Sequence, residues 1–239
     1  MLPLEKPKED SVYRKQYQAL KLEIYRRFVD SDWNRLSDVI KEIALRILEF
    51  IDADRAGFFL LDNDKSEINI YTEYCLQGIE PCLTAMRNIP YAVFPFWMTQ
   101  IATGNVMHIP DVPSLPDEAE PEKQLLAEVG IRSGIARGIF EKNLPIGFVS
   151  FCGSREIRYW DELEADLLCV FTEMTRHYIT RKRVIESQEA ELHNMHLSNL
   201  QLEKGIEEAK RLALEAAFAN SSKSEFISKL CYELKSPVN

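Results

Sequence analysis

The sequence of 239 residues predicts an α+β fold, an antiparallel sheet flanked by helices and followed by one long coiled-coil helix. Three observations carry this prediction. Apolar residues recur every three or four positions in two N-terminal stretches, and short apolar runs separated by turn residues fill the middle of the chain. A seven-residue repeat occupies the last third. Hydrophobic residues make up 46% and charged residues 28%, so the chain can bury one good core.

Two amphipathic helices are predicted at the N-terminus, one in a lead-in segment (1–30) and one at the start of the following domain. From Val12 to Phe28, apolar residues recur with a helical period. After two aspartates the pattern resumes, and we expect Ser31 or Asp32 to cap this second helix. Its broad apolar face consists of Trp33, Leu36, Val39, Ile40, Ile43, Ile47 and Phe50.

The middle of the chain, about residues 53–160, predicts strands and short helices. DRAGFFLL and SEINIYTEYC are predicted strands joined by a turn at 62–65, and IRSGIARGIF and PIGFVSFCG a hairpin with its turn at 141–143. Between them we expect a short helix (AVFPFWMTQIA) ended by Gly104, the strand VMHI, and a short helix (EKQLLAEV) closed by Gly130. This order favours an antiparallel sheet with helices packed on it.

The last third of the chain shows a seven-residue repeat and has no proline between Trp160 and Pro237. Positions a are Tyr178, Ile185, Leu192, Asn199, Ile206 and Ala213, and positions d include Met174, Met195, Leu202, Ala209 and Ala216, with Arg181 and Gln188 as weaker members. Roughly 60 residues are too many for a helix that lies alone on a small domain. The sequence therefore predicts a parallel homodimer through the C-terminal helix, with Asn199 favouring two strands in one register.

Charge and cysteine content argue against several functional classes. The net charge of −9 argues against a nucleic-acid partner, which requires clustered Lys and Arg. No apolar run approaches the ~18 residues of a membrane span, and the N-terminus lacks a secretory signal. The five cysteines show neither a C-x-x-C pair nor metal-ligand spacing with the four histidines. We therefore expect reduced thiols in a cytoplasmic protein without a metal site.

About residues 30–180 resemble a GAF domain, the small sensory module related to PAS. The resemblance lies in G-I-R-S at 130–133, I-G-F-V-S-F at 146–151 and R-x-W-x-x-x-E at 158–164, in this order. The stretch I-P-D-V-x-x-L-P at 109–116 is typical of GAF domains placed before histidine kinases. The resemblance implies a GAF domain over 31–180 whose role is allosteric.

The end of the sequence resembles the phosphoacceptor helix of sensor histidine kinases. KSEFISKLCYELKSPVN, residues 223–239, fits the family pattern except at Cys231 and Tyr232, and Tyr232 stands where the phosphoacceptor histidine would be. By position Glu233 is the adjacent acid. The resemblance implies a signalling coiled coil over 181–222 that leads into a truncated phosphoacceptor helix, since no ATP-binding domain follows in this sequence.

Tyrosine is a poor replacement for the phosphoacceptor histidine. A phenol has a pKa of about 10, so only about one molecule in a thousand is phenolate at neutral pH. We therefore expect no catalysis, and interpret the chain as the sensing and dimerisation module of a two-component sensor kinase, with a kinase catalytic domain or response regulator as partner. Two alternatives stay open: a fragment of an active histidine kinase that lost its catalytic domain and histidine, or a structural dimeric adaptor without ligand.

Candidate ligand-binding residues are Phe94, Phe96 and Trp97, on the helix that usually lines the GAF pocket, and Arg137, within a predicted strand. An arginine flanked by isoleucines on one strand face requires an anion, either a small anionic ligand or an internal carboxylate. Bilin-binding relatives carry a cysteine in the helix before G-[IV]-R-S, and EKQLLAEVG has none. We expect neither covalent bilin nor haem, because a lone histidine such as His108 is typical of a surface position.

Overall fold

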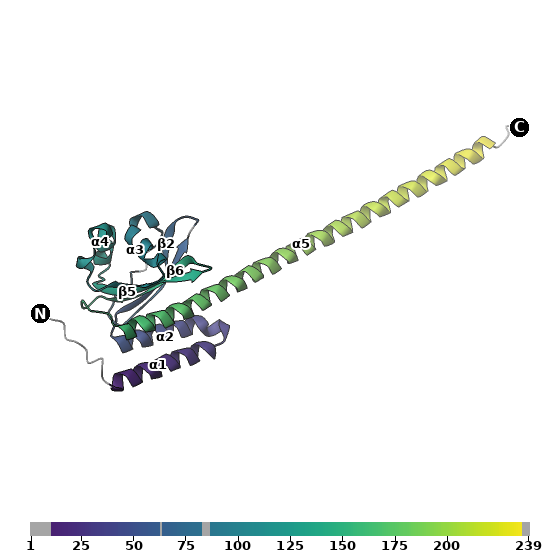
Figure 1. The fold of residues 1–239 in the computed structure, drawn as a ribbon. Helices are drawn as coiled ribbons and strands as arrows, with labels where there is room; N and C mark the ends of the chain where they lie inside the picture. The colour runs from purple at the N-terminus through teal and green to yellow at the C-terminus, as the bar shows by residue number, and fades with distance from the viewer. Residues whose placement is uncertain (1–10, 63, 83–86, 236–239) are drawn as a thin grey trace. The chain divides into compact units, whose positions relative to one another are not determined.

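The structure is a computed structural model that describes residues 11–62, 64–82 and 87–235, with side chains described up to Cys231. The chain divides into two compact units, Met1–Thr180 and Arg181–Asn239. The first contains a six-stranded antiparallel sheet, with helices on both faces (Figure 1). The predicted α+β fold is confirmed.

The sheet has the strand order β3-β2-β1-β6-β5-β4. The strands are β1 (Arg55–Asp62), β2 (Glu67–Cys75), β3 (Ile89–Pro90), β4 (Val106–Ile109), β5 (Ser133–Glu141) and β6 (Leu144–Gly153). In the turn between β5 and β6, Lys142 and Asn143 both have positive φ, 48° and 68°. This conformation matches the right-handed twist of a two-residue hairpin, which confirms the predicted turn.

The helices separate into two layers. One face of the sheet carries α2 (Leu36–Ile51) and the part of α5 (Glu162–Lys235) that precedes Arg181, with α1 (Ser11–Val29) packed on the outer side of α2, whereas α3 (Pro95–Ala102) and α4 (Glu120–Glu128) cover the other face (Figure 1). Short 3-10 turns lie at Trp33–Arg35, Tyr91–Val93, Val112–Ser114 and Asp117–Ala119. The predicted stops after α3 and α4 are confirmed, because Gly104 and Gly130 adopt positive φ there.

Two apolar clusters fill the space on either side of the sheet. The helix-side cluster joins α1, α2 and α5 to β1, β5 and β6, and includes Ile47, Leu48, Leu167 and Phe171. The α3-side cluster joins α3 and α4 to the opposite faces of the strands, and includes Phe59, Phe94, Trp97 and Phe148. α1 is held by Tyr17 and Lys21, which both donate to the Asp166 carboxylate of α5, with a Lys21 Nζ to Oδ2 distance of 2.6 Å.

The predicted N-cap of α2 is wrong. Asp32 precedes a 3-10 turn and makes no side-chain capping bond, and Arg35 occupies the N-cap position of α2 itself. The Ser31 hydroxyl donates back to the carbonyl of Arg27, at the end of α1. The 3-10 turn thus satisfies the first backbone groups without the expected side chain.

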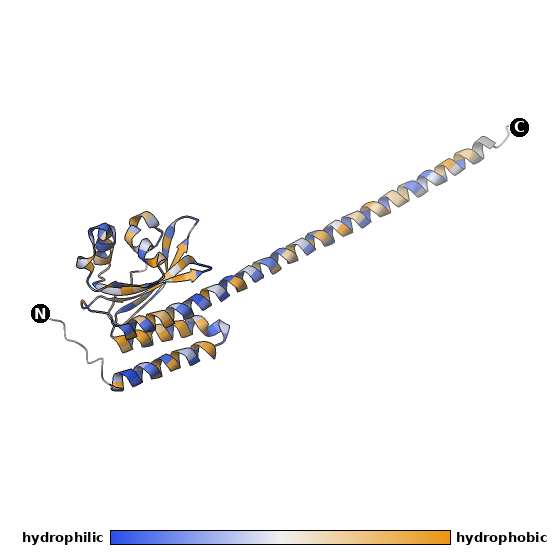
Figure 2. Cartoon of the chain, in the orientation of Figure 1, coloured by the Kyte–Doolittle hydropathy of each residue, from blue (hydrophilic) through white to orange (hydrophobic). Residues whose placement is uncertain are grey.

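The second unit is the continuation of α5 beyond Thr180. Every described side chain from Glu186 to Cys231 is exposed, including large apolar ones such as Leu192, Leu202 and Ile206. Apolar and polar residues alternate along this segment (Figure 2). Among the described residues, no helix has the length and apolar character needed to cross a membrane.

Candidate functional site

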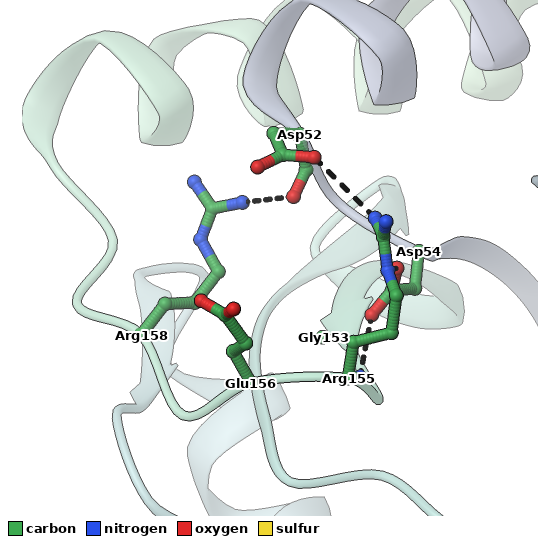
Figure 3. Close-up of a pocket in the computed structure, with 6 residues that line it drawn as sticks. All are labelled: Asp52, Asp54, Gly153, Arg155, Glu156 and Arg158. Carbon is green, nitrogen blue, oxygen red and sulfur yellow. Dashed lines mark hydrogen bonds and ion pairs between the residues drawn. The ribbon is translucent and has the colours of Figure 1, made fainter.

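The segment between β6 and α5, residues 154–164, is held by an unusually dense set of polar contacts. We call it the β6–α5 junction. It connects the last strand of the sheet to the helix that continues into the second unit. Its contacts reach back to Asp52 and Asp54 at the end of α2 (Figure 3).

Asp54 anchors the beginning of the junction. Its carboxylate accepts the backbone N–H groups of Ser154 (2.5 Å) and Arg155 (2.8 Å) and forms an ion pair with the Arg155 guanidinium. The residue is only 2% exposed. Burial by itself would raise the pKa of the Asp54 carboxyl, but the two amides and the guanidinium outweigh it and hold that pKa below its usual value.

Arg158 links α2 to α5. Its Nη1 donates to the carbonyl oxygens of Ile51 and Asp52, both at 2.6 Å, where α2 ends in a left-handed residue. Its Nη2 forms an ion pair with Glu164, whose side chain is 1% exposed. The guanidinium also lies over the Trp160 ring, 4.3 Å from the ring centroid. A cation at a helix C-terminus is favourable, and here the same cation neutralises a buried carboxylate.

Glu164 completes the start of α5. Its second oxygen accepts the backbone N–H of Asp161 at 2.8 Å, and the Asp161 carboxylate accepts the N–H of Glu164 at 2.8 Å. This reciprocal pair is a capping box, which fixes where the helix begins. The R-x-W-x-x-x-E pattern therefore consists of Arg158, Trp160 and Glu164, whose contacts join the end of α2 to the start of α5. They set the position of α5 relative to α2.

The hollow inside the junction is small and polar. It measures about 120 Å³ and is lined by Asp52, Asp54, Gly153, Arg155, Glu156 and Arg158 (Figure 3). Both arginines are already engaged with carboxylates or carbonyls. The arrangement is suited to positioning backbone rather than to catalysis.

The predicted ligand residues on α3 belong to the α3-side cluster. Phe94 and Trp97 are 1% and 6% exposed, and Phe96 is partly buried against the same cluster. Trp97 lies 5.3 Å from Phe94 and 5.8 Å from Phe148 between ring centroids, and Phe148 stacks on Phe59 at 4.4 Å. The rings are packed against one another.

Arg137 does not share a pocket with these rings. Its strand neighbours Ile135 and Ile139 are in the helix-side cluster, whereas Ala136 is in the α3-side cluster. Side chains alternate along a strand, so Arg137 lies on the face opposite Phe94 and Trp97. The two sets of candidate ligand residues therefore face opposite sides of the sheet. The residue itself is partly buried, in register with Val106 and Val149.

The arginine that is truly buried was not predicted. Arg55 is 4% exposed and pairs with Glu73 at 3.1 Å, and it also donates to the carbonyl of Glu80. Glu73 in turn accepts the backbone N–H of Cys82 at 2.7 Å and contacts its thiol. The sequence does carry a signal for this buried ion pair, because Arg55 and Glu73 each lie within a predicted apolar strand.

The remaining candidates from the sequence are Tyr232 and Glu233 of the phosphoacceptor-like helix, and His108. Tyr232 and Glu233 lie within α5, but their side chains are outside the described residues. His108 is an exposed residue of β4, paired with Ile135. Among the described residues, no group of three or more His, Cys, Asp or Glu side chains is arranged to hold a metal ion.

The comparisons with known proteins agree on the fold. Residues 35–176 match the GAF domain family. No curated protein matches the chain. Similar solved structures include a biliverdin-bound protein in its far-red-absorbing dark state, with TM-score 0.56 and 16% identity over 69% of this chain and 98% of that one.

Two further structures come from phytochromes. One is the phycocyanobilin-bound GAF domain of a cyanobacterial phytochrome, with TM-score 0.54 and 16% identity over 70% of this chain and 96% of that one. The other is the photosensory core module of Stigmatella aurantiaca phytochrome, with TM-score 0.58 and 14% identity over 76% and 39%. At these identities the likeness establishes the fold alone.

The family match spans more than half of the chain and contains the sheet, the α3-side cluster, most of the helix-side cluster and the β6–α5 junction. The three motifs that suggested the resemblance all lie within it. The chain belongs to the GAF domain family.

Proposed function

We propose that this chain is the signal-sensing and dimerisation module of a two-component sensor histidine kinase, in which the state of the GAF domain passes along α5. One observation carries the proposal. A single helix, Glu162–Lys235, begins in the GAF core, where Leu167 and Leu168 are fully buried, and continues for more than fifty residues beyond Thr180. A change at the β6–α5 junction therefore acts on the same element that carries the output.

The exposed apolar side chains of α5 favour pairing with a partner helix. The heptad register that gives a positions at Leu192 and Ile206 continues without interruption to Ile227, and the d positions to Leu230. These side chains are 41–66% exposed, and exposed leucines and isoleucines at this spacing are the seam of a coiled coil. We infer a second copy of this chain as the partner, parallel and in register. Asn199 and Asn220 at a positions favour this arrangement.

The link to a kinase rests on the sequence from Lys223 onward. Glu225 to Lys235 are helical, as a phosphoacceptor helix requires. Tyr232 at the histidine position makes phosphoryl transfer from ATP unfavourable, because a phenol is almost fully protonated at neutral pH. We propose that the chain does not phosphorylate itself and that its partners are a kinase catalytic domain or a response regulator. We place it in the cytoplasm on the cysteine pattern alone.

A bilin, which similar solved structures contain, does not fit the α3-side space of this domain. The α3-side space is occupied by the stacked rings of Phe59 and Phe148 and by the Trp97 ring tilted against Phe148, and the helix before Gly130 has no cysteine. The packed aromatic core favours a second candidate function, a structural dimeric adaptor without ligand. If a small anion is sensed instead, we expect it at Arg137, on the face of the sheet that carries α2 and α5.

Labelling with γ-phosphate tests the kinase link. The chain and its Tyr232→His variant are each incubated with ATP and a histidine-kinase catalytic domain supplied in trans. We expect label on the variant at residue 232 and none on the parent. Absence of label on Tyr232→His would contradict the kinase context, and equal label on both would refute the argument from phenol chemistry. A chain that stays dimeric but accepts no label in either form would support the adaptor.

A further inference from the structure

A second hollow lies on the face of the sheet that carries α2 and α5, between α2, β2 and α5. It measures about 210 Å³. Six of its lining residues carry hydroxyl groups, namely Ser37, Tyr71, Thr72, Tyr74, Thr175 and Tyr178, and none of the lining residues is charged. It lies entirely within the first unit and on the opposite face from Phe94 and Trp97.

A β-bulge builds this concentration of hydroxyls. In the pairing of β1 with β2, Phe58 faces Thr72 and Phe59 faces Ile70, so Tyr71 is the extra residue. A bulge redirects side chains that would otherwise alternate between the two faces. Tyr71, Thr72 and Tyr74 therefore line one hollow although they are nearly consecutive, and the Tyr71 ring lies 5.0 Å from that of Phe58.

The floor of the hollow is buried and its mouth is open to solvent. Thr175 is fully buried and its hydroxyl donates to the carbonyl of Phe171 at 2.7 Å, which leaves its oxygen able to accept a hydrogen bond. Phe58 is 2% and Tyr178 9% exposed. Ser37 and Tyr71 are exposed and mark the opening toward solvent.

We propose that this hollow is a binding site for a neutral, single-ring aromatic compound that carries a hydroxyl or amide group. Its volume exceeds that of a cavity of roughly 150 Å³ that is known to hold benzene, so one substituted ring fits. Aromatic walls favour a ring, and hydroxyls favour a polar substituent. A charged ligand would lose its hydration without gaining an opposite charge.

Such an occupant would touch both α2 and α5. Thr175 and Tyr178 lie nearly one turn apart on α5, and Tyr178 also stacks on Trp33, with ring centroids 5.5 Å apart. The inference goes beyond the proposed signalling function and does not depend on it. A test that reads only binding to this hollow leaves the coiled coil and the kinase link untouched.

The experiment titrates the full chain with phenol, benzoate and benzylamine at pH 7, followed by ligand-detected NMR and by thermal melting. We expect saturable binding of phenol, and binding of the two charged rings at least tenfold weaker. Ser37→Leu fills the mouth of the hollow and should abolish phenol binding. Lys41→Leu places the same side chain one turn further along α2, outside the lining, and should leave binding unchanged.

A second variant keeps the proposal testable if Ser37→Leu does not fold. Tyr74→Phe retains the ring and removes one hydroxyl, and we expect about fivefold weaker phenol binding, the factor that one neutral hydrogen bond contributes. The proposal is overturned if phenol shows no saturation up to its solubility, because the hollow then holds only water. It is also overturned if benzoate or benzylamine binds as well as phenol, or if neither Ser37→Leu nor Tyr74→Phe weakens binding.

Discussion

The guanidinium of Arg158 lies 4.3 Å from the centroid of the Trp160 ring, and from there it reaches both the end of α2 and the start of α5. The face of the indole attracts the guanidinium, which favours this position of the arginine. Because the same group satisfies two carbonyls and one buried carboxylate, a shift of α2 relative to α5 would break at least one of these contacts. The junction therefore makes the two helices move together.

Replacing Arg158 should destabilise the domain strongly. Arg158→Gln removes the cation beside Glu164, whose side chain is 1% exposed, and leaves an unpaired buried carboxylate. We expect a loss of about 3–5 kcal/mol in the free energy of unfolding, measured by urea denaturation. Arg176→Gln is the matched control on the same helix, because Arg176 and its partner Glu173 are 33% and 52% exposed. That variant should lose less than about 1 kcal/mol.

The carboxyl of Asp54 should give the domain a defined acid sensitivity. Its pKa is lower in the folded protein than the value of 3.8 expected for an unfolded aspartate. The stabilisation is therefore fully present above about pH 5 and is lost as the pH falls through 3.8 toward the folded value. Unfolding measured between pH 6 and pH 2.5 should show this decline, and Asp54→Asn should reduce its slope. An unchanged slope in the variant would show that Asp54 has no part in it.

Dimer formation should depend on the side chains at positions a and d of α5, and not on exposed apolar side chains at other heptad positions. Leu202→Lys with Ile206→Lys places charges at positions d and a, and we expect a monomer by light scattering at tens of micromolar. The control, Leu197→Lys with Leu214→Lys, also replaces two exposed apolar side chains by lysine, but at positions f and b. This variant should stay dimeric. In both variants the GAF domain should stay folded, which cooperative thermal unfolding followed by circular dichroism checks. A monomeric parent chain would contradict the dimer.

The cysteines should differ sharply in reactivity. Burial and the neighbouring Glu73 carboxylate raise the pKa of Cys82 to about 12, and burial raises that of Cys152 to about 11. Only the thiolate is nucleophilic, so both should resist alkylation in the folded protein. Cys231 is exposed. Iodoacetamide at pH 8 followed by mass spectrometry should therefore modify Cys231 first, and modification of Cys82 before Cys231 would contradict the burial of this thiol.

Much of the fold follows from local signals in the sequence. The turn at Lys142 and Asn143 and the helix stops at Gly104 and Gly130 are decided by residues that tolerate positive φ, so a few neighbours suffice to predict them. The R-x-W-x-x-x-E pattern likewise located the junction. Its role could not be predicted, because Arg158 meets carbonyls 107 and 106 positions earlier in the chain.

The placement of the candidate ligand residues could not be predicted for a related reason. Alternation along β5 predicts that Arg137 shares a face with Ile135 and Ile139, but not which helices cover that face. Burial of Arg55 depends on Glu73 in the neighbouring strand, and the hydroxyl-lined hollow depends on an extra residue at Tyr71. Both are consequences of strand register, which the hydrophobic pattern alone did not fix.

A cysteine cross-link in the tail tests the central claim most directly, that α5 pairs in parallel and in register with a second copy. The background is Cys231→Ser, which removes the exposed thiol of the tail. In a parallel coiled coil, two d positions face each other closely enough for a disulfide, and two f positions do not. After mild oxidation, Leu202→Cys should give a covalent dimer on a non-reducing gel, and Leu197→Cys should not. Equal cross-linking of the two variants, or none with Leu202→Cys, would contradict the account.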